Sequence, residues 1–188
     1  FKMDLSYLNI GFAITGSFCT FSKVIPEISR LCDLGADIYP IMSEMAYSTD
    51  TRFGKCKDFI NQIEEITGKK IISTIRGAEP IGPKHYLDAL IVAPCTGNTI
   101  AKIANGVTDS CVSMAAKANL RNSKPLIIAV STNDGLGTSA KNIGLLPFGQ
   151  DDFEKKPNSL VADMTQIAQT TDTAIKGKQI QPLLCKQA

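Results

Sequence analysis

Small polar residues follow an apolar run abruptly in the segment VAPCTGNTIAKIANGVTDS, residues 92–110. The apolar run stops at Pro94, and four small polar groups precede the next helical pattern: Thr96, Gly97, Asn98 and Thr99. A turn between a strand and a helix needs only one or two such residues. Hydroxyl, amide and glycine groups in this number indicate that a ligand is held at the junction.

The same change from apolar to small polar residues occurs at the ends of three other predicted strands. These ends are Thr15-Gly16-Ser17, Ser43 and Ser131-Thr132-Asn133, and we expect no carboxylate among them before Asp134. In an open parallel sheet, ligands bind beyond the carboxyl ends of the strands. Hydroxyls and helix N-termini without nearby acid suit phosphate, so the pattern predicts a site for a phosphate-bearing cofactor.

Each junction alone has a simpler interpretation, because Ser, Thr and Asn are ordinary helix N-caps and Gly is common in turns. Four junctions of the same character favour the ligand. The first junction, in ITGSFCTFSKV, contains neither GxGxxG nor the Walker lysine pattern. Ordinary dinucleotide or nucleoside-triphosphate binding is therefore not indicated.

Strand and helix patterns alternate along the chain and position these junctions. Continuous apolar runs predict strands at 8–14, 36–42, 87–93 and 125–131, with a short strand at 71–75. Apolar residues at helical spacing predict a helix that closes at Gly35, and further helices at 58–67, 98–105, 109–120 and 159–176. Residues 76–86 are expected to form a loop. Near-continuous strands separated by helices are typical of a parallel sheet covered on both faces, within one α/β domain spanning 1–188.

Residues 138–150, TSAKNIGLLPFGQ, do not fit this scheme. They pass from an expected helix to Pro147 with no room for the strand that a parallel sheet calls for next. Either the fold lacks that strand, or residues between Leu146 and Pro147 are absent from the chain. We favour the second interpretation.

Composition excludes several classes of function. The chain has 188 residues, of which 44% are hydrophobic and 20% charged, as expected for a soluble globular domain. The formal net charge is +2, and Lys and Arg are scattered along the sequence, so the sequence does not indicate the basic surface patch that binds nucleic acid. No apolar run approaches the roughly 20 residues of a membrane helix, and the first residues lack a signal-peptide pattern.

The six cysteines are widely spaced and form no CxxC pair, so we expect them to be reduced, which favours the cytoplasm. His85 is the single histidine, and no metal site is expected.

Three segments carry a family resemblance: GFAITGS, APCTGNTIAKIANGVTDS and PLIIAVSTND. They resemble the signature regions of the flavin-binding, cysteine-decarboxylase-like flavoproteins. The middle region usually resembles Pro-Ala-Ser-Ala-Asn-Thr, where this chain has Pro94-Cys95-Thr96-Gly97-Asn98-Thr99. The last region usually carries Pro-x-Met-Asn, and this chain keeps only the Asn. These departures argue against decarboxylation of a peptidyl cysteine.

One branch of that family is similar over nearly the whole chain, through STDTRFG, AEPIGPK, TDSCVSMAAKANLRNSKP, PFGQDD and KKPNSLVA. During sporulation, its members act with a second subunit to oxidise a dihydro- or hydroxytetrahydro-dipicolinate to dipicolinate. Its members also carry a strand just before the Pro-Phe-Gly-Gln segment. The resemblance thus implies an oxidoreductase subunit with a partner subunit and a small dicarboxylate substrate.

The resemblance further implies a flavodoxin-like or Rossmann-like three-layer sandwich and FMN as cofactor, with NADP available through the partner. Matching family positions implies that the FMN phosphate and ribityl region bind Gly16, Ser17 and Ser43. The flavin would then be flanked by Thr96, Asn98, Thr99 and Ser131.

Catalytic residues are less well indicated. A dicarboxylate calls for cationic donors, and Arg pairs best with carboxylates through its planar fork. Arg52, in a loop, ranks above Arg121, whose charge suits a helix C-terminus. Cys95 is a candidate thiolate or redox group, although such a residue more often fills space. His85 is the remaining candidate base, although a lone His after Pro-Lys is more typical of a solvated loop.

Two other functions stay open: a stand-alone FMN-dependent decarboxylase of the same fold, and a non-catalytic chain that stabilises the partner subunit. The resemblance also implies a homo-oligomer, because flavoproteins of this family complete their flavin sites at subunit contacts. Residues 110–120, SCVSMAAKANL, support this through small and apolar residues around much of one helix. The alternative is that this helix lies deep in the monomer.

Overall fold

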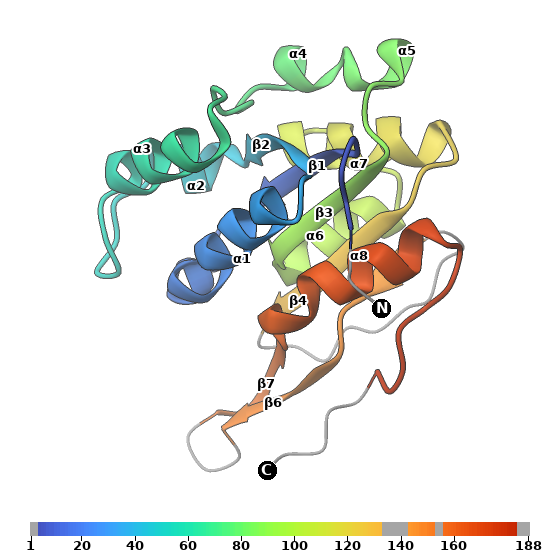
Figure 1. The fold of residues 1–188 in the computed structure, drawn as a ribbon. Coiled ribbons are helices and arrows are strands. Elements are labelled where there is room, and N and C mark those ends of the chain that lie inside the picture. Colours follow the sequence, from blue (N-terminus) through green and yellow to red (C-terminus); the bar gives the residue numbers. More distant parts are fainter. Residues whose placement is uncertain (1–3, 133–142, 153–155, 184–188) are drawn as a thin grey trace.

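One mixed sheet with helices on both faces forms the body of the protein (Figure 1). The computed structural model describes residues 4–132, 143–152 and 156–183. The strands lie in the order β2-β1-β3-β4-β7-β6, and β5 pairs with β4 beside this path. Their bounds are β1 (Asn9–Ile14), β2 (Asp37–Met42), β3 (Ala89–Cys95), β4 (Leu126–Thr132), β5 (Ile143–Leu145), β6 (Phe148–Asp152) and β7 (Lys156–Ala162).

The strands β1 to β4 are parallel and form the centre of the sheet. Every residue of β3 is buried, and so is every residue of β1 after Asn9. Strands that are apolar on both faces are stable where helices exclude water from both faces. The predicted α/β sandwich is confirmed, and these four strands lie within two residues of their expected bounds.

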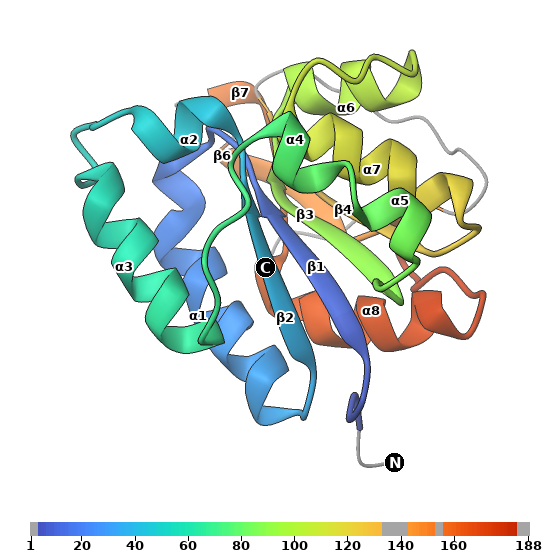
Figure 2. The same ribbon diagram turned by 90° about the horizontal axis from the view of Figure 1, so that it is seen from above.

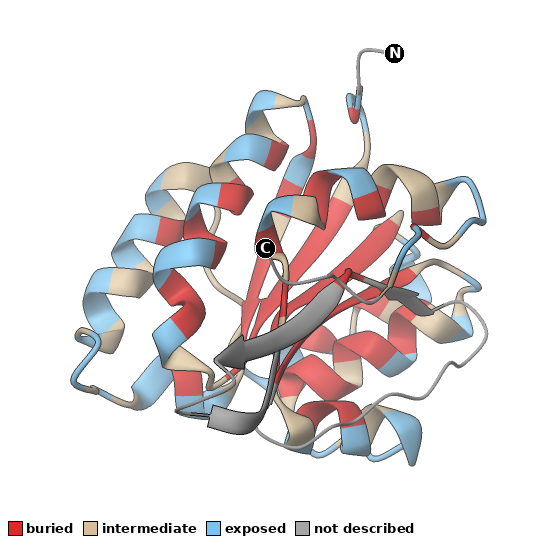
Figure 3. Cartoon of the chain, turned by 90° about the horizontal axis from the view of Figure 1, so that it is seen from below, coloured by how far each residue is buried: buried red, intermediate tan, exposed pale blue. Residues whose placement is uncertain are grey.

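Two groups of helices cover the two faces of the sheet (Figure 2). One face packs against α1 (Phe21–Asp33), α3 (Cys56–Thr67) and α8 (Ile167–Ile175). The other packs against α4 (Ile75–Ala78), α5 (Ile81–Lys84), α6 (Gly97–Ala104) and α7 (Cys111–Arg121). Figure 3 shows the buried residues concentrated between these layers. None of the described helices is long and apolar enough to cross a membrane.

The predicted end of the first helix is confirmed at Gly35. This residue follows α1 with φ +92°, a left-handed conformation that an L side chain rarely adopts. A Cβ atom there would also lie 2.5 Å from Ser6 Oγ and 3.0 Å from Ser6 Cα. Only glycine fits this turn without displacing the segment that leads into β1.

The carboxyl-terminal part of the sheet departs from the expected parallel pattern. The predicted helix at 159–176 is wrong in its first turn, because β7 extends to Ala162 and α8 begins only at Ile167. β7 runs antiparallel to both β4 and β6. It pairs with Ser131 and Thr132, so it supplies the end of β4 with a hydrogen-bonded neighbour.

The expectation that residues 138–150 leave no room for a strand is also wrong. β5 is parallel to β4 and pairs with Leu126–Ile128, directly before Leu146. The chain itself therefore supplies the strand that the parallel sheet calls for. This removes the reason for inferring missing residues between Leu146 and Pro147.

Residues 71–86 contain less strand and more helix than expected. The predicted strand at 71–75 is reduced to one bridge between Ile41 and Ile72. Two short helices, α4 and α5, occupy the predicted loop and bury Ala78 and Ile81 in the cluster that includes α7. At the start of α4, Thr74 Oγ1 accepts a hydrogen bond from Gly77 N at 3.1 Å.

Candidate functional site

The carboxyl ends of β2, β1, β3 and β4 share one edge of the sheet, because these strands are parallel and adjacent. The residues after β1 meet the end of β4 there, across the end of β3. Ser17 Oγ and Ser131 Oγ are 2.7 Å apart, in a hydrogen bond that either hydroxyl can donate. We call the polar residues at this edge the carboxyl-edge cluster: Thr15, Gly16, Ser17, Ser43, Thr96, Asn98, Thr99 and Ser131.

A buried hydroxyl, that of Thr15, connects the first junction to the third. Thr15 is 1% exposed. Its Oγ1 donates to Pro94 O at 2.7 Å and accepts from Thr96 N at 3.0 Å. The turn from β3 into α6 is therefore fixed by a side chain from the end of β1. Sequence reasoning placed Thr15 in the first junction without assigning it a role, since its contact spans about eighty residues.

The residues after Ser17 present unpaired backbone donors. Helix η1 (Phe18–Thr20) begins there and continues into α1. The N–H groups of Phe18 and Cys19 have no acceptor within the described parts of the chain, and the Ser17 side chain does not cap them. Unpaired N–H groups at a helix N-terminus favour anions. This is the part of the carboxyl-edge cluster that best suits a phosphate.

The hydroxyls of Ser43 and Thr96 begin helices instead. Ser43 Oγ accepts from Ala46 N at 3.3 Å at the start of α2 (Glu44–Ser48). Thr96 Oγ1 accepts from Thr99 N at 3.4 Å at the start of α6, and it lies 3.1 Å from Thr99 Oγ1. The capping interpretation therefore holds at these two junctions. A ligand there would meet hydroxyls that still have a hydrogen to donate.

The remaining predicted cofactor residues lie at the same edge. Asn98 is exposed in the first turn of α6, and Gly16 is half-buried beside Ser17. A Cβ atom at Gly16 would lie 3.7 Å from the Phe18 ring, an ordinary contact. The position accommodates a glycine without requiring one.

Glu44 corrects the expectation that these strand ends carry no carboxylate, because it follows Ser43 directly. Its Oε1 accepts a hydrogen bond from Cys111 N at 3.2 Å, at the beginning of α7. A carboxylate at a helix N-terminus is stabilised by the helix dipole. Glu44 therefore joins α2 to α7, a contact that no local pattern in the sequence indicates.

Cys95 is not suited to the predicted nucleophilic or redox role. It is fully buried among apolar residues of the α6–α7 face. Burial raises the pKa of its thiol far above the ordinary value, so the reactive thiolate is not populated at neutral pH. Cys111 is likewise buried, its Sγ donates to Met42 O at 2.9 Å, and burial raises its pKa to about 12. The space-filling interpretation holds for Cys95.

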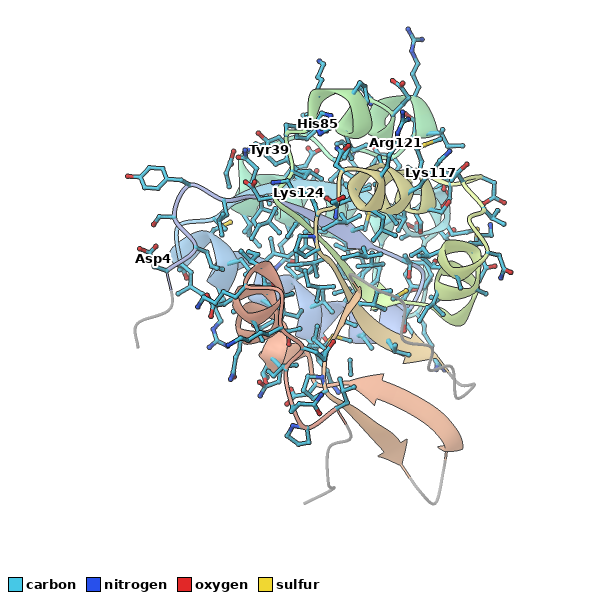
Figure 4. The ribbon with its side chains drawn as sticks, turned by 90° about the vertical axis from the view of Figure 1, so that its right-hand side faces the viewer. Asp4, Tyr39, His85, Lys117, Arg121 and Lys124 are labelled. Carbon is cyan, nitrogen blue, oxygen red and sulfur yellow. The ribbon has the colours of Figure 1, made fainter. Side chains whose placement is uncertain are left out.

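His85 lies at the opposite edge of the sheet. It ends α5 and precedes β3, so the length of that strand, roughly 20 Å, separates it from the carboxyl-edge cluster. Figure 4 shows it on the same side of the molecule as Lys124, which precedes β4. The structure does not support His85 as a catalytic base at this site.

Arg52 is not joined to the carboxyl-edge cluster by a hydrogen bond or ion pair within the described residues. It is exposed in the turn between α2 and α3, and its guanidinium lies 4.9 Å from the centre of the Phe53 ring. The turn itself is ordered by a hydrogen bond from Cys56 N to Asp50 Oδ1 at 2.9 Å. Arg121 ends α7, as the helix-dipole interpretation predicts.

Within residues 4–132, 143–152 and 156–183, no three His, Cys, Asp or Glu side chains come together as metal ligands. The arrangement of the carboxyl-edge cluster is that of a hydroxyl-lined anion site. It offers hydrogen-bond donors, and none of its eight residues has a titratable side chain.

Comparison with known proteins shows the family of the chain. Residues 2–140 match the family model described as Flavoprotein. The chain is 47% identical over 184 residues to the B subunit of dipicolinate synthase from Bacillus subtilis (strain 168), covering 93% of this chain and 92% of that protein.

Solved structures show the same fold. The crystal structure of the B subunit of dipicolinate synthase from Bacillus halodurans C superposes with a TM-score of 0.89 at 44% identity, over 99% of this chain and 100% of the other. The structure of the FMN-dependent cysteine decarboxylase SpaF gives a TM-score of 0.63 at 17% identity, over 90% and 98% of the two chains. At that identity the second similarity concerns the fold alone.

The Thr15 hydroxyl should matter for stability more than other buried hydroxyls. We expect Thr15→Val to lower the free energy of unfolding by about 1–3 kcal/mol, because the buried Thr96 N–H loses its acceptor. Thr171→Val is the matched control, since that buried hydroxyl only donates to Ile167 O within α8. Urea unfolding followed by circular dichroism measures both losses, and equal losses would contradict the role of Thr15.

Proposed function

The chain belongs to the flavoprotein family, and we propose that it is the flavin-binding B subunit of a dipicolinate synthase. The observation that carries this proposal is the 47% identity to such a subunit over 93% of the chain. In this role it acts with an A subunit to oxidise a dihydro- or hydroxytetrahydro-dipicolinate to dipicolinate during sporulation. A cytoplasmic location is part of the proposal and agrees with the free thiols of the described cysteines.

We propose FMN as the cofactor, held at the carboxyl-edge cluster. The N–H groups of Phe18 and Cys19 would bind the phosphate together with Gly16 and Ser17, at the positive end of the helix that continues as α1. The Ser17–Ser131 pair would lie beside the ribityl chain or the ring. Thr96, Asn98 and Thr99 would flank the flavin from the start of α6, and Ser43 would add a hydroxyl from α2.

The chemistry requires removal of a hydride and a proton from a dihydro ring that carries two carboxylates, and a hydroxytetrahydro ring must in addition lose one molecule of water. A bound flavin supplies a hydride acceptor, and NADP on the A subunit is the alternative acceptor in our proposal. The residues of this chain would bind and orient: hydroxyls donate hydrogen bonds, and unpaired N–H groups hold negative charge. Because the residues of the carboxyl-edge cluster have no titratable side chain, we propose that the proton leaves through a group of the A subunit.

A stand-alone decarboxylase is the less favoured function. The most similar proteins named above are synthase subunits, whereas the decarboxylase SpaF shares 17% identity and hence only the fold. Cys95, in the family's middle motif, is buried and has a raised pKa. A non-catalytic role toward the A subunit is separated from our proposal by the second experiment below.

We also propose that the chain forms a homo-oligomer. The small and apolar residues at 110–120, which suggested this from the sequence, are not the surface involved. The small residues of α7 are buried within the monomer, where α4, α5 and α6 pack around that helix. Exposed apolar side chains occur instead beside the carboxyl-edge cluster, at Met45, Tyr47 and Phe53. Apolar side chains gathered at a surface favour a protein contact, and this one would border the proposed flavin.

Ser17→Asp tests the phosphate assignment. The added carboxylate would lie beside the phosphate, and like charges a few ångströms apart repel strongly enough to weaken FMN binding about tenfold or more. Ser123→Asp is the control, because it adds the same charge at an exposed residue at the opposite edge of the sheet. Titration of the apoprotein with FMN by flavin fluorescence measures the affinities. Equal affinity in wild type and Ser17→Asp would refute the assignment.

The isolated chain loaded with FMN should form no dipicolinate at a useful rate, because the residues of the carboxyl-edge cluster have no titratable side chain to act as the base. Addition of the A subunit should start turnover, measured as growth of the aromatic absorbance of the product. Efficient turnover by the isolated chain contradicts the need for the A subunit. Full activity of the A subunit in complex with a Ser17→Asp chain that carries no FMN would instead show that this chain is a non-catalytic partner.

The oligomer should depend on the apolar side chains beside the site. Light scattering should give a multiple of the 20.2 kDa chain mass for wild type, and Tyr47→Glu with Phe53→Glu should shift the mass toward the monomer. Tyr7→Glu is the control, because Tyr7 is 95% exposed and precedes β1 at the opposite edge. A monomer mass for wild type across a wide concentration range would exclude the oligomer.

A further inference from the structure

A groove outside the carboxyl-edge cluster lies between α6, the loop that follows it, and α7. Its volume is about 360 Å³, within the range of about 300–1,000 Å³ that is usual for small-molecule sites. The apolar lining comes from Ile103, Val107 and Leu120. The polar lining includes Thr108, Lys117 and Arg121.

The loop after α6 shapes this groove. Gly106 adopts φ +69°, and Val107 N donates to Lys102 O at 2.9 Å, which closes the end of α6. The chain then leaves Val107 with 41% of its surface exposed, above the side of α7. The exposed part of Val107 adds to the apolar lining of the groove.

Two cations stand beside this apolar surface without a counter-charge. Lys117 and Arg121 are one turn apart on α7, as Figure 4 shows, and neither makes an ion pair with a described residue. The acid of the neighbouring loop, Asp109, is 2.9 Å from Lys102 instead. The helix dipole accounts for Arg121 at the end of α7. It does not account for Lys117 or for the apolar hollow next to both.

We propose that this groove binds a small organic anion, a carboxylate with a flat apolar body. The body would lie on Ile103, Val107 and Leu120, while Arg121 binds a carboxylate through its fork and Lys117 neutralises a second anionic group. Two cations one helical turn apart suit a dianion, and the choice of a ring with two carboxylates in 1,3 relation rests on the proposed function, whose product belongs to this class. The site is separate from the carboxyl-edge cluster, because it lies at the other end of α6 from Thr96.

Isophthalate, a benzene ring with two carboxylates in 1,3 relation, is the probe for this site. Titration of the ¹⁵N-labelled full chain at low salt should give saturable shifts of the amide signals of Ile103, Gly106 and Val107. Neutral isophthalamide should bind wild type about tenfold more weakly than isophthalate does. Isophthalate should likewise bind the variant K117Q/R121Q about tenfold more weakly than wild type, because each exposed charge pair contributes only modestly to the binding free energy. Added salt should weaken isophthalate binding in wild type.

K23Q/K57Q is the matched control. It removes two exposed positive charges from α1 and α3, on the opposite face of the sheet, and should bind isophthalate like wild type. Equal affinity of wild type and K117Q/R121Q would overturn the proposal, as would shifts confined to the carboxyl-edge cluster or no saturable binding. Loss of association with the A subunit in K117Q/R121Q, with no anion bound by wild type, would also overturn it and identify the groove as a protein contact.

Discussion

Strand β3 is buried along its whole length, and helices of both groups pack against its two faces. No polar side chain can stand within such a strand without losing contact with water. The polar residues of the central sheet are therefore gathered at its ends. Because β1 to β4 are parallel, all four carboxyl ends lie along one edge, and four separate stretches of sequence become one surface. The carboxyl-edge cluster is a consequence of this burial.

The central sheet and the position of the cluster could be predicted because both follow from local pattern. Continuous apolar runs mark strands buried on both faces, and small polar residues after them mark the edge. β7 could not be predicted in this way, since Leu160 and Met164 also fit helical spacing. What decides its conformation is the hydrogen bonding of Ser131 and Thr132 with Val161 and Leu160, a contact between distant segments. The helices α4 and α5 have four residues each, too few to show a period.

The chemistry of single residues was harder to predict than the location of the site. Cys95 directly precedes the polar turn at Thr96 in sequence, yet its side chain lies in the apolar layer that includes α6 and α7. His85 is near the flavoprotein motif in the chain but at the wrong end of β3. Arg52 has the right charge, and the described structure places its guanidinium over the Phe53 ring. For Cys95 and His85, residue type indicated a reaction, whereas burial and position along β3 do not favour it.

The four junctions, alike in sequence, are physically of two kinds. Ser43 and Thr96 satisfy the first N–H groups of their own helices, so their presence is explained by folding alone. Ser17 does not: its hydroxyl bonds Ser131, and the N–H groups of Phe18 and Cys19 stay without an acceptor in the described structure. A protein that needed only a helix start would gain stability from a capping hydroxyl there. The missing cap leaves these donors free, which is why we propose Ser17 as the junction at which an external anion binds.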